Sequence, residues 1–108
     1  MKRKILLIEH DFRAAFFIMY ALARTECEVK LATTGQEGLN LATTVRFDFI
    51  ILGANLPDMN VDEVCDKLKE RHFTRKIPVI PIPDEMAGQI RQAEHDFYTL
   101  AQYEKRGL

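Results

Sequence analysis

Cysteine is scarce in this chain. Only two cysteines, Cys27 and Cys65, occur in 108 residues, and neither belongs to a CxxC motif or to a Cys/His pair with metal-ligand spacing. This usage favours reduced thiols over a disulfide framework or a zinc site. A membrane-length apolar run is also missing, and the apolar residues 5–8 are too few for a signal-peptide core. We therefore expect a cytoplasmic protein without a membrane segment.

An excess of charge of one sign is missing as well. The chain has 15 Lys and Arg against 16 Asp and Glu, for a formal net charge of −1. Such a balance creates no long-range field that would favour nucleic acid or an anionic membrane as a direct partner. Repeats, low-complexity tracts and linkers are absent too, so we expect one domain over residues 1–108, long enough to bury an independent core.

The first third of the sequence predicts a buried strand and a helix. Residues 4–8 are mostly apolar and lead into Glu9-His10-Asp11, which is typical of a central parallel strand and its exit loop. Asp11 is placed to cap a helix from Phe12 to about Arg24. That helix is apolar over most of its circumference, so we expect other elements to cover it heavily.

The middle of the chain repeats this alternation twice. Residues 28–32 alternate polar and apolar, as in an outer strand, and Thr34-Gly35-Gln36-Glu37 matches a capping box. Residues 48–52 form a nearly unbroken apolar run that predicts a strand buried on both faces. Asn60 can cap the next helix. The expected buried positions are Leu39, Ala42 and Val45 in the first of these helices, and Val61, Val64, Cys65 and Leu68 in the second.

The last third predicts two more strands. Residues 77–83 read as a strand with a local distortion at Pro81, which has no N–H for the ladder. A short helix over 84–94, a strand over 97–100 and a last helix from residue 101 follow. Strands and helices that alternate in this way predict an α/β fold, with a five-stranded parallel sheet between helices.

Five stretches, in this order and spacing, resemble the receiver domain of two-component response regulators. They are residues 4–11, 33–39, 47–60, 76–80 and 94–100. The resemblance implies the CheY-like, flavodoxin-like (βα)5 three-layer sandwich, with strand order 2-1-3-4-5 and, here, shortened fourth and fifth helices. It also implies a role in phosphorelay signalling with a protein partner, a kinase or an output domain.

Measured against that family, the sequence lacks most of the phospho-acceptor pocket. Gly53 stands where the resemblance expects the acceptor aspartate, and His10 replaces the second metal-binding acid after Glu9. Pro83 stands at the position of a hydroxyl, and Leu100 at that of a lysine. Phosphoryl transfer depends on a nucleophile and on compensating charge, and these residues supply neither.

We therefore expect a degenerate receiver that acts as a protein-interaction module without phosphorylation. Its degenerate pocket would comprise Glu9, His10, Asp11, Gly53, Pro83 and Leu100. We expect no catalytic residue, no metal, no cofactor and no enzymatic activity.

Alternatives remain open at this point. Asp58 or Asp11 could accept a phosphoryl group in place of Gly53, and Glu9-His10-Asp11 could hold a metal rather than cap a helix. A flavin or nucleotide site is disfavoured because this acidic loop would repel phosphate. Because the chain ends early in a helix that receivers usually complete, we expect either a truncated domain or a flank covered by a partner or, in a homodimer, by a second copy.

Overall fold

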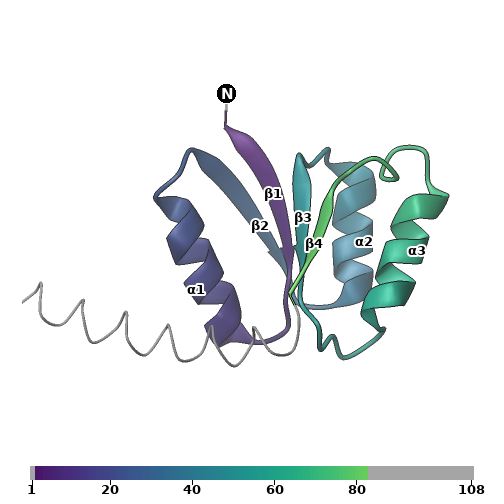
Figure 1. Cartoon of the computed structure of the whole chain (residues 1–108), viewed down its shortest axis with the longest axis horizontal. Coiled ribbons are helices and arrows are strands. Elements are labelled where there is room, and N and C mark those ends of the chain that lie inside the picture. Colours follow the sequence, from purple (N-terminus) through teal and green to yellow (C-terminus); the bar gives the residue numbers. More distant parts are fainter. Residues whose placement is uncertain (1, 83–108) are drawn as a thin grey trace, which may run out of the picture.

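Residues 2–82, which the computed structural model describes, form a parallel four-stranded sheet with order β2-β1-β3-β4. Helix α1 lies on one side of this sheet, and α2 and α3 lie on the other (Figure 1). The elements are β1 (Arg3–Ile8), α1 (Phe12–Ala23), β2 (Cys27–Ala32), α2 (Gly35–Thr44), β3 (Phe49–Leu52), α3 (Val61–Glu70) and β4 (Val79–Pro81). The predicted order of the first four strands is confirmed. The helix, strand and last helix expected after residue 83 lie outside the described residues.

Short polar side chains start all three helices between residues 2 and 82, as the sequence predicts. Asp11 Oδ1 accepts hydrogen bonds from the backbone N–H groups of Arg13 and Ala14, at 2.9 and 3.4 Å. Thr34 caps α2, and Asn60 forms a complete capping box with Glu63 at α3. Each cap satisfies N–H groups that have no partner inside the first turn, and so fixes where the chain turns from loop to helix.

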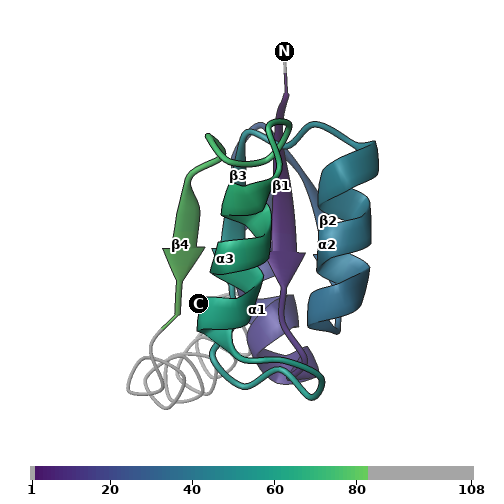
Figure 2. The same ribbon diagram turned by 90° about the vertical axis from the view of Figure 1, so that its right-hand side faces the viewer.

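One face of the sheet, which we call the closed face, is covered by α2 and α3. The register pairs Leu6 with Ile50 and Ile8 with Leu52, so these four side chains point to the same face. All four are fully buried. They pack with Ala32, Ala42, Phe47, Val64 and Leu68 into one core. In Figure 2, α2 and α3 stand in front of the strands, with β4 at the sheet edge. The buried positions expected for α2 and α3 all belong to this core or pack against it.

The opposite face, which we call the open face, carries α1, whose main contacts among the described residues are with β2 (Figure 1). On this face Leu7 of β1 is fully buried, its neighbour Ile51 on β3 is half-buried, and Ile80 on β4 is 50% exposed. Helix α1 itself buries only Ala14 and Ala15. Phe12, Phe16 and Tyr20 form a stripe at helical spacing and are 59%, 61% and 55% exposed. The expectation that α1 is heavily covered is therefore wrong for this part of the chain.

Strand β4 continues through Pro81 without losing a bond to β3. Ile82 N–H donates to Leu52 O at 2.7 Å, and Ile50 N–H donates to Pro78 O at 2.9 Å. Alternate residues of a strand bond to the same neighbour, so the missing N–H of Pro81 faces away from β3. The predicted strand is confirmed over Val79–Pro81, and the distortion expected at Pro81 does not interrupt this ladder.

Two further expectations concern the cysteines and membrane-spanning helices. Cys27 and Cys65 are both free thiols. Between residues 2 and 82, no helix combines the length and the apolar character needed to cross a membrane.

Candidate functional site

The carboxyl ends of β1 and β3 bring four of the six predicted pocket residues together. Ile8 pairs with Leu52 at the end of the ladder, and Gly53 N–H donates to Ile8 O at 2.7 Å. Glu9, His10 and Asp11 leave β1 at this edge, where open parallel sheets gather their functional groups. Pro83 and Leu100 lie outside the described residues, so their part in the pocket stays a prediction.

The carboxylate of Glu9 occupies the space that a side chain at position 53 would need. A Cβ built on Gly53 would collide with Glu9 Oε2 and would lie 2.8 Å from Glu9 Cδ and 3.1 Å from the Ile8 carbonyl oxygen. Glu9 is only 9% exposed, and its Oε1 accepts a hydrogen bond from Asp11 N–H at 3.1 Å. The φ angle of Gly53 lies outside the left-handed region, so space rather than backbone conformation excludes a side chain here. Position 53 therefore carries no side chain, and the Glu9 carboxylate fills the space beside it.

Asp11 and His10 have different surroundings from Glu9. Asp11 caps α1, which confirms the helix-cap interpretation of the Glu9-His10-Asp11 triplet. His10 lies at a bend and is exposed. The three consecutive side chains therefore have different roles. Glu9 fills the space beside Gly53, His10 lies at the surface and Asp11 caps α1.

The receiver resemblance implies Mg²⁺ at this edge, and the described residues do not fit it. Mg²⁺ requires near-octahedral oxygen coordination and is usually held through one or two carboxylates that converge on it. Here Asp11 is directed to the start of α1 and Glu9 to Gly53. In the part of the chain that the structure describes, no three His, Cys, Asp or Glu side chains come together as a metal site.

Asp58, the alternative acceptor, binds the start of α2. Its Oδ1 accepts from Gly35 N–H at 2.8 Å and its Oδ2 from Gln36 N–H at 2.9 Å. These two bonds, from Gln36 first and Gly35 second, lower the pKa of Asp58 below its ordinary value of 3.8. Both carboxylate oxygens are thus engaged by a helix terminus, and stabilising the anion makes it a weaker nucleophile.

Sequence patterns missed these roles of Glu9 and Asp58. The sequence predicts Glu9 as a retained metal-binding acid and Asp58 as an alternative phosphoryl acceptor. A glycine where a family has an acid signals free space, but only the register of β1 against β3 shows which side chain enters it. Similarly, sequence patterns do not predict that Asp58 caps α2, because Asp58 lies 22 positions from Gln36 and reaches it only through tertiary contact.

Comparison with known proteins fits this geometry. The sequence profile described as "Response regulator receiver domain" matches residues 5–97. The chain belongs to this family. As a receiver, it is 31% identical over 85 residues to the alkaline phosphatase synthesis transcriptional regulatory protein PhoP of Bacillus subtilis, covering 79% of this chain and 35% of that protein. It is 33% identical over 91 residues to the response regulator ArlR of Staphylococcus aureus, covering 79% of this chain and 40% of ArlR. The chain thus spans well under half the length of these relatives.

Solved receiver structures have the same fold. The chemotaxis response regulator CheY4 of Vibrio cholerae matches with a TM-score of 0.73 and 23% identity, over 87% of this chain and 81% of that one. The receiver domain of the sensor histidine kinase PA1611 from Pseudomonas aeruginosa, solved with magnesium in its active-site cleft, matches with a TM-score of 0.74 and 22% identity. That match covers 77% of this chain and 68% of the other. These likenesses support the predicted CheY-like, flavodoxin-like α/β fold.

Proposed function

We propose that this receiver acts in two-component signalling without phosphorylation of an aspartate, as a module that binds a protein partner constitutively. The observation that carries the proposal is the contact between Glu9 and Gly53. A phosphorylated receiver needs room at the end of β3 for an acceptor side chain and for the transferred group. Here the backbone at position 53 has no side chain, and a buried carboxylate fills the adjacent space.

Electrostatics supports the same proposal. An incoming phosphodonor is anionic, and the nearest described groups, Glu9 and the Asp11 carboxylate, come from an acidic loop. Phosphoryl transfer relies on cations around the acceptor to offset the charge that collects there. No Lys or Arg lies within the segments 8–12 and 52–60 that form this edge. The pocket is therefore poorly suited to bind the donor, quite apart from its missing nucleophile.

The partner we propose is a sensor kinase or an output domain, in the cytoplasm and without direct contact to nucleic acid or membrane. Membership of the receiver family supports this choice, since such domains pair with these proteins. A homodimer is compatible with the apolar stripe on α1. The cellular response that this protein controls would then depend on which partner it binds.

Intact-protein mass spectrometry after treatment with acetyl phosphate and Mg²⁺ tests the proposal. The protein should not gain the mass of about 80 Da that one phosphoryl group adds. Gly53→Asp should also stay unlabelled, because its side chain meets Glu9 both sterically and as a like charge. Gly53→Ala is the matched control, because its Cβ meets Glu9 in the same way but carries no carboxylate.

A stable adduct on the unmodified protein would overturn the proposal, and peptide mapping would then show whether Asp58 or Asp11 carries it. Efficient labelling of the single variant Gly53→Asp would show that the Glu9 side chain moves away from position 53 with little loss of free energy. Any sensor kinase or output domain that proves to bind this protein should bind with the same affinity with and without acetyl phosphate, as measured by titration.

A further inference from the structure

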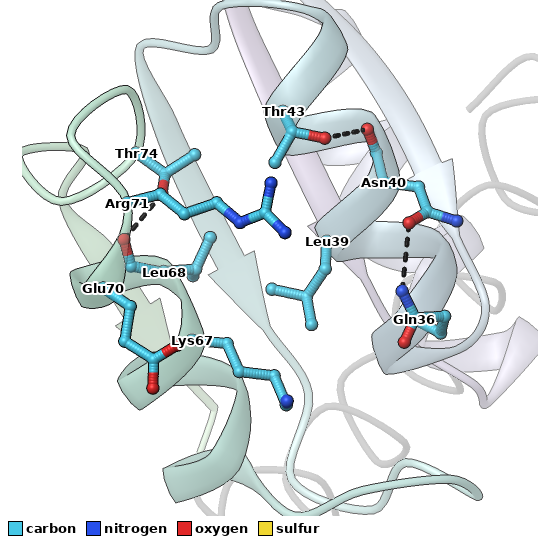
Figure 3. Close-up of a pocket in the computed structure, with 9 residues that line it drawn as sticks. All are labelled: Gln36, Leu39, Asn40, Thr43, Lys67, Leu68, Glu70, Arg71 and Thr74. Atoms are coloured by element: carbon cyan, nitrogen blue, oxygen red, sulfur yellow. Dashed lines mark hydrogen bonds between the residues drawn. The ribbon is translucent and has the colours of Figure 1, made fainter.

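The closed face carries a second polar feature, a cleft between α2 and α3. It has a volume of about 220 Å³ and is bounded by Leu39, Asn40 and Thr43 of α2, and by Lys67, Leu68 and Arg71 at the end of α3. Leu68 is buried and Leu39 half-buried, so the two leucines form an apolar floor. Figure 3 shows the ends of Lys67 and Arg71 extending from α3 toward α2, above this floor.

The charge in the cleft is not balanced by the protein. Two cations, Lys67 and Arg71, line it against one anion, Glu70, which stays on the α3 side in Figure 3. Within residues 2–82, neither cation forms an ion pair. On the α2 side, Thr43 donates its hydroxyl proton to Asn40 O at 2.8 Å, and Gln36 Nε2 donates to Asn40 Oδ1 at 3.0 Å. The polar groups of α2 therefore already bond to one another, and no carboxylate of α2 reaches the cations.

Basic residues near a helix C-terminus often serve only the helix dipole, and this explanation suits Lys69 better than Arg71. Arg71 is the C-cap of α3 with φ −101° and ψ 132°, so its backbone has already left the helix. From that position its side chain extends across the cleft toward α2 rather than along its own helix (Figure 3). One carbonyl in the last turn of α3 has another donor, because Thr74 Oγ1 donates to Leu68 O at 2.6 Å.

From these observations we propose that the cleft between α2 and α3 binds a small oxyanion, a carboxylate or phosphate group, held by Arg71 and Lys67. The planar guanidinium of Arg71 offers paired N–H donors that match two oxygens of such a group, and Lys67 adds a second charge. The leucine floor accommodates the carbon next to a carboxylate. The volume is below the range of about 300–1,000 Å³ typical of drug-sized ligands, so the site suits a small group. The inference is independent of the pocket at Gly53.

An NMR titration of the full chain at constant ionic strength tests the site. Inorganic phosphate and succinate are the two probes, one for each source of the oxyanion, and sodium chloride is the reference salt. We expect saturable shifts at the backbone amides of Asn40 and Thr43 and at Arg71 Nε–H with at least one probe, and none with chloride. Arg71→Ala should weaken binding by about tenfold, because it removes the charged donors.

Lys69→Ala is the matched control. It removes the same charge from the last turn of α3, and Lys69 does not line this cleft. Its affinity should stay within about twofold of the unmodified protein. Arg71→Gln repeats the measurement if Arg71→Ala loses its dispersed spectrum. Shifts that fail to saturate, that chloride reproduces, or that persist unchanged in the Arg71 variants would overturn the site.

Discussion

The two faces of the sheet differ although the same strands build them. On the closed face, Ile50 is fully buried beneath α2 and α3. On the open face, its chain neighbour Ile51 is half-buried and Ile80 is 50% exposed. Side chains along a strand alternate between faces, so a single residue step separates the two environments. An apolar strand sequence therefore predicts burial on both faces of the sheet. The described helices bury these side chains fully on the closed face alone.

The helices follow the same division. Helix α2 is tied to the rest of the fold by Asp58, which lies 23 positions beyond the Gly35 N–H group that it accepts. It also approaches β1 closely, since a Cβ on Gly38 would lie 2.7 Å from Ile8 Cγ1. Helix α1 is capped only by its immediate neighbour Asp11 and keeps three large side chains exposed. Helix α2 is thus held in part by a distant residue, whereas α1, like α3 with its Asn60–Glu63 capping box, starts at a local cap.

The largest expected effect comes from replacing the adjacent isoleucines of β3. Ile50→Ala should lower the free energy of unfolding by about 2–5 kcal/mol, because it leaves a cavity in a core that cannot collapse. Ile51→Ala makes the same chemical change on the half-buried face and should cost about 1–2 kcal/mol. Urea denaturation followed by circular dichroism measures both. An equal loss of unfolding free energy in the two variants would show that β3 is buried equally on both faces.

A smaller effect is expected from Asp58→Asn at the start of α2. Because folding lowers the pKa of Asp58, its charged form contributes stability above the ordinary value of 3.8, and that contribution is lost as the pH falls through the lowered folded value. The variant should therefore melt below the unmodified protein at pH 7, and the gap should close on acidification below 3.8. Melting temperatures between pH 7 and pH 2 follow this trend.

Asp66→Asn is the control for this measurement. It removes an exposed charge from the middle of α3 without touching a helix start. A gap that closes equally in both variants would assign the effect to net charge rather than to the hydrogen bonds from Gly35 and Gln36.

The smallest effect is expected on α1. Phe16 is 61% exposed and its ring stacks on that of Phe12 with centroids 6.1 Å apart, so Phe16→Ala should change stability by less than about 1 kcal/mol. Ala15→Leu, on the buried side of the same helix, should cost more, about 1–3 kcal/mol, because it overfills a packed contact. A cost above about 2 kcal/mol for Phe16→Ala would mean that the aromatic stripe is covered in solution.

The receiver-like fold was predictable from the sequence because its signals are local. Apolar runs at residues 5–8 and 48–52 and the caps Asp11, Thr34 and Asn60 set the strands and the helix starts within a residue or two. Periodicity also identified Val64 and Leu68 as core positions. Among residues 2–82, α1 is less covered than its apolar sequence predicts, because periodicity shows that a helix is apolar all round but not which neighbours are placed to cover it.

For the candidate site, the sequence by itself determined that position 53 carries no nucleophile and that an acidic loop follows β1. Only the tertiary structure decided that the Glu9 carboxylate fills the space beside Gly53, that Asp58 caps α2, and that Arg71 and Lys67 face α2 across a cleft. The physical reason is range. Capping and alternation act between near neighbours in the chain, whereas these contacts depend on strand register and helix packing that bring distant residues to one place.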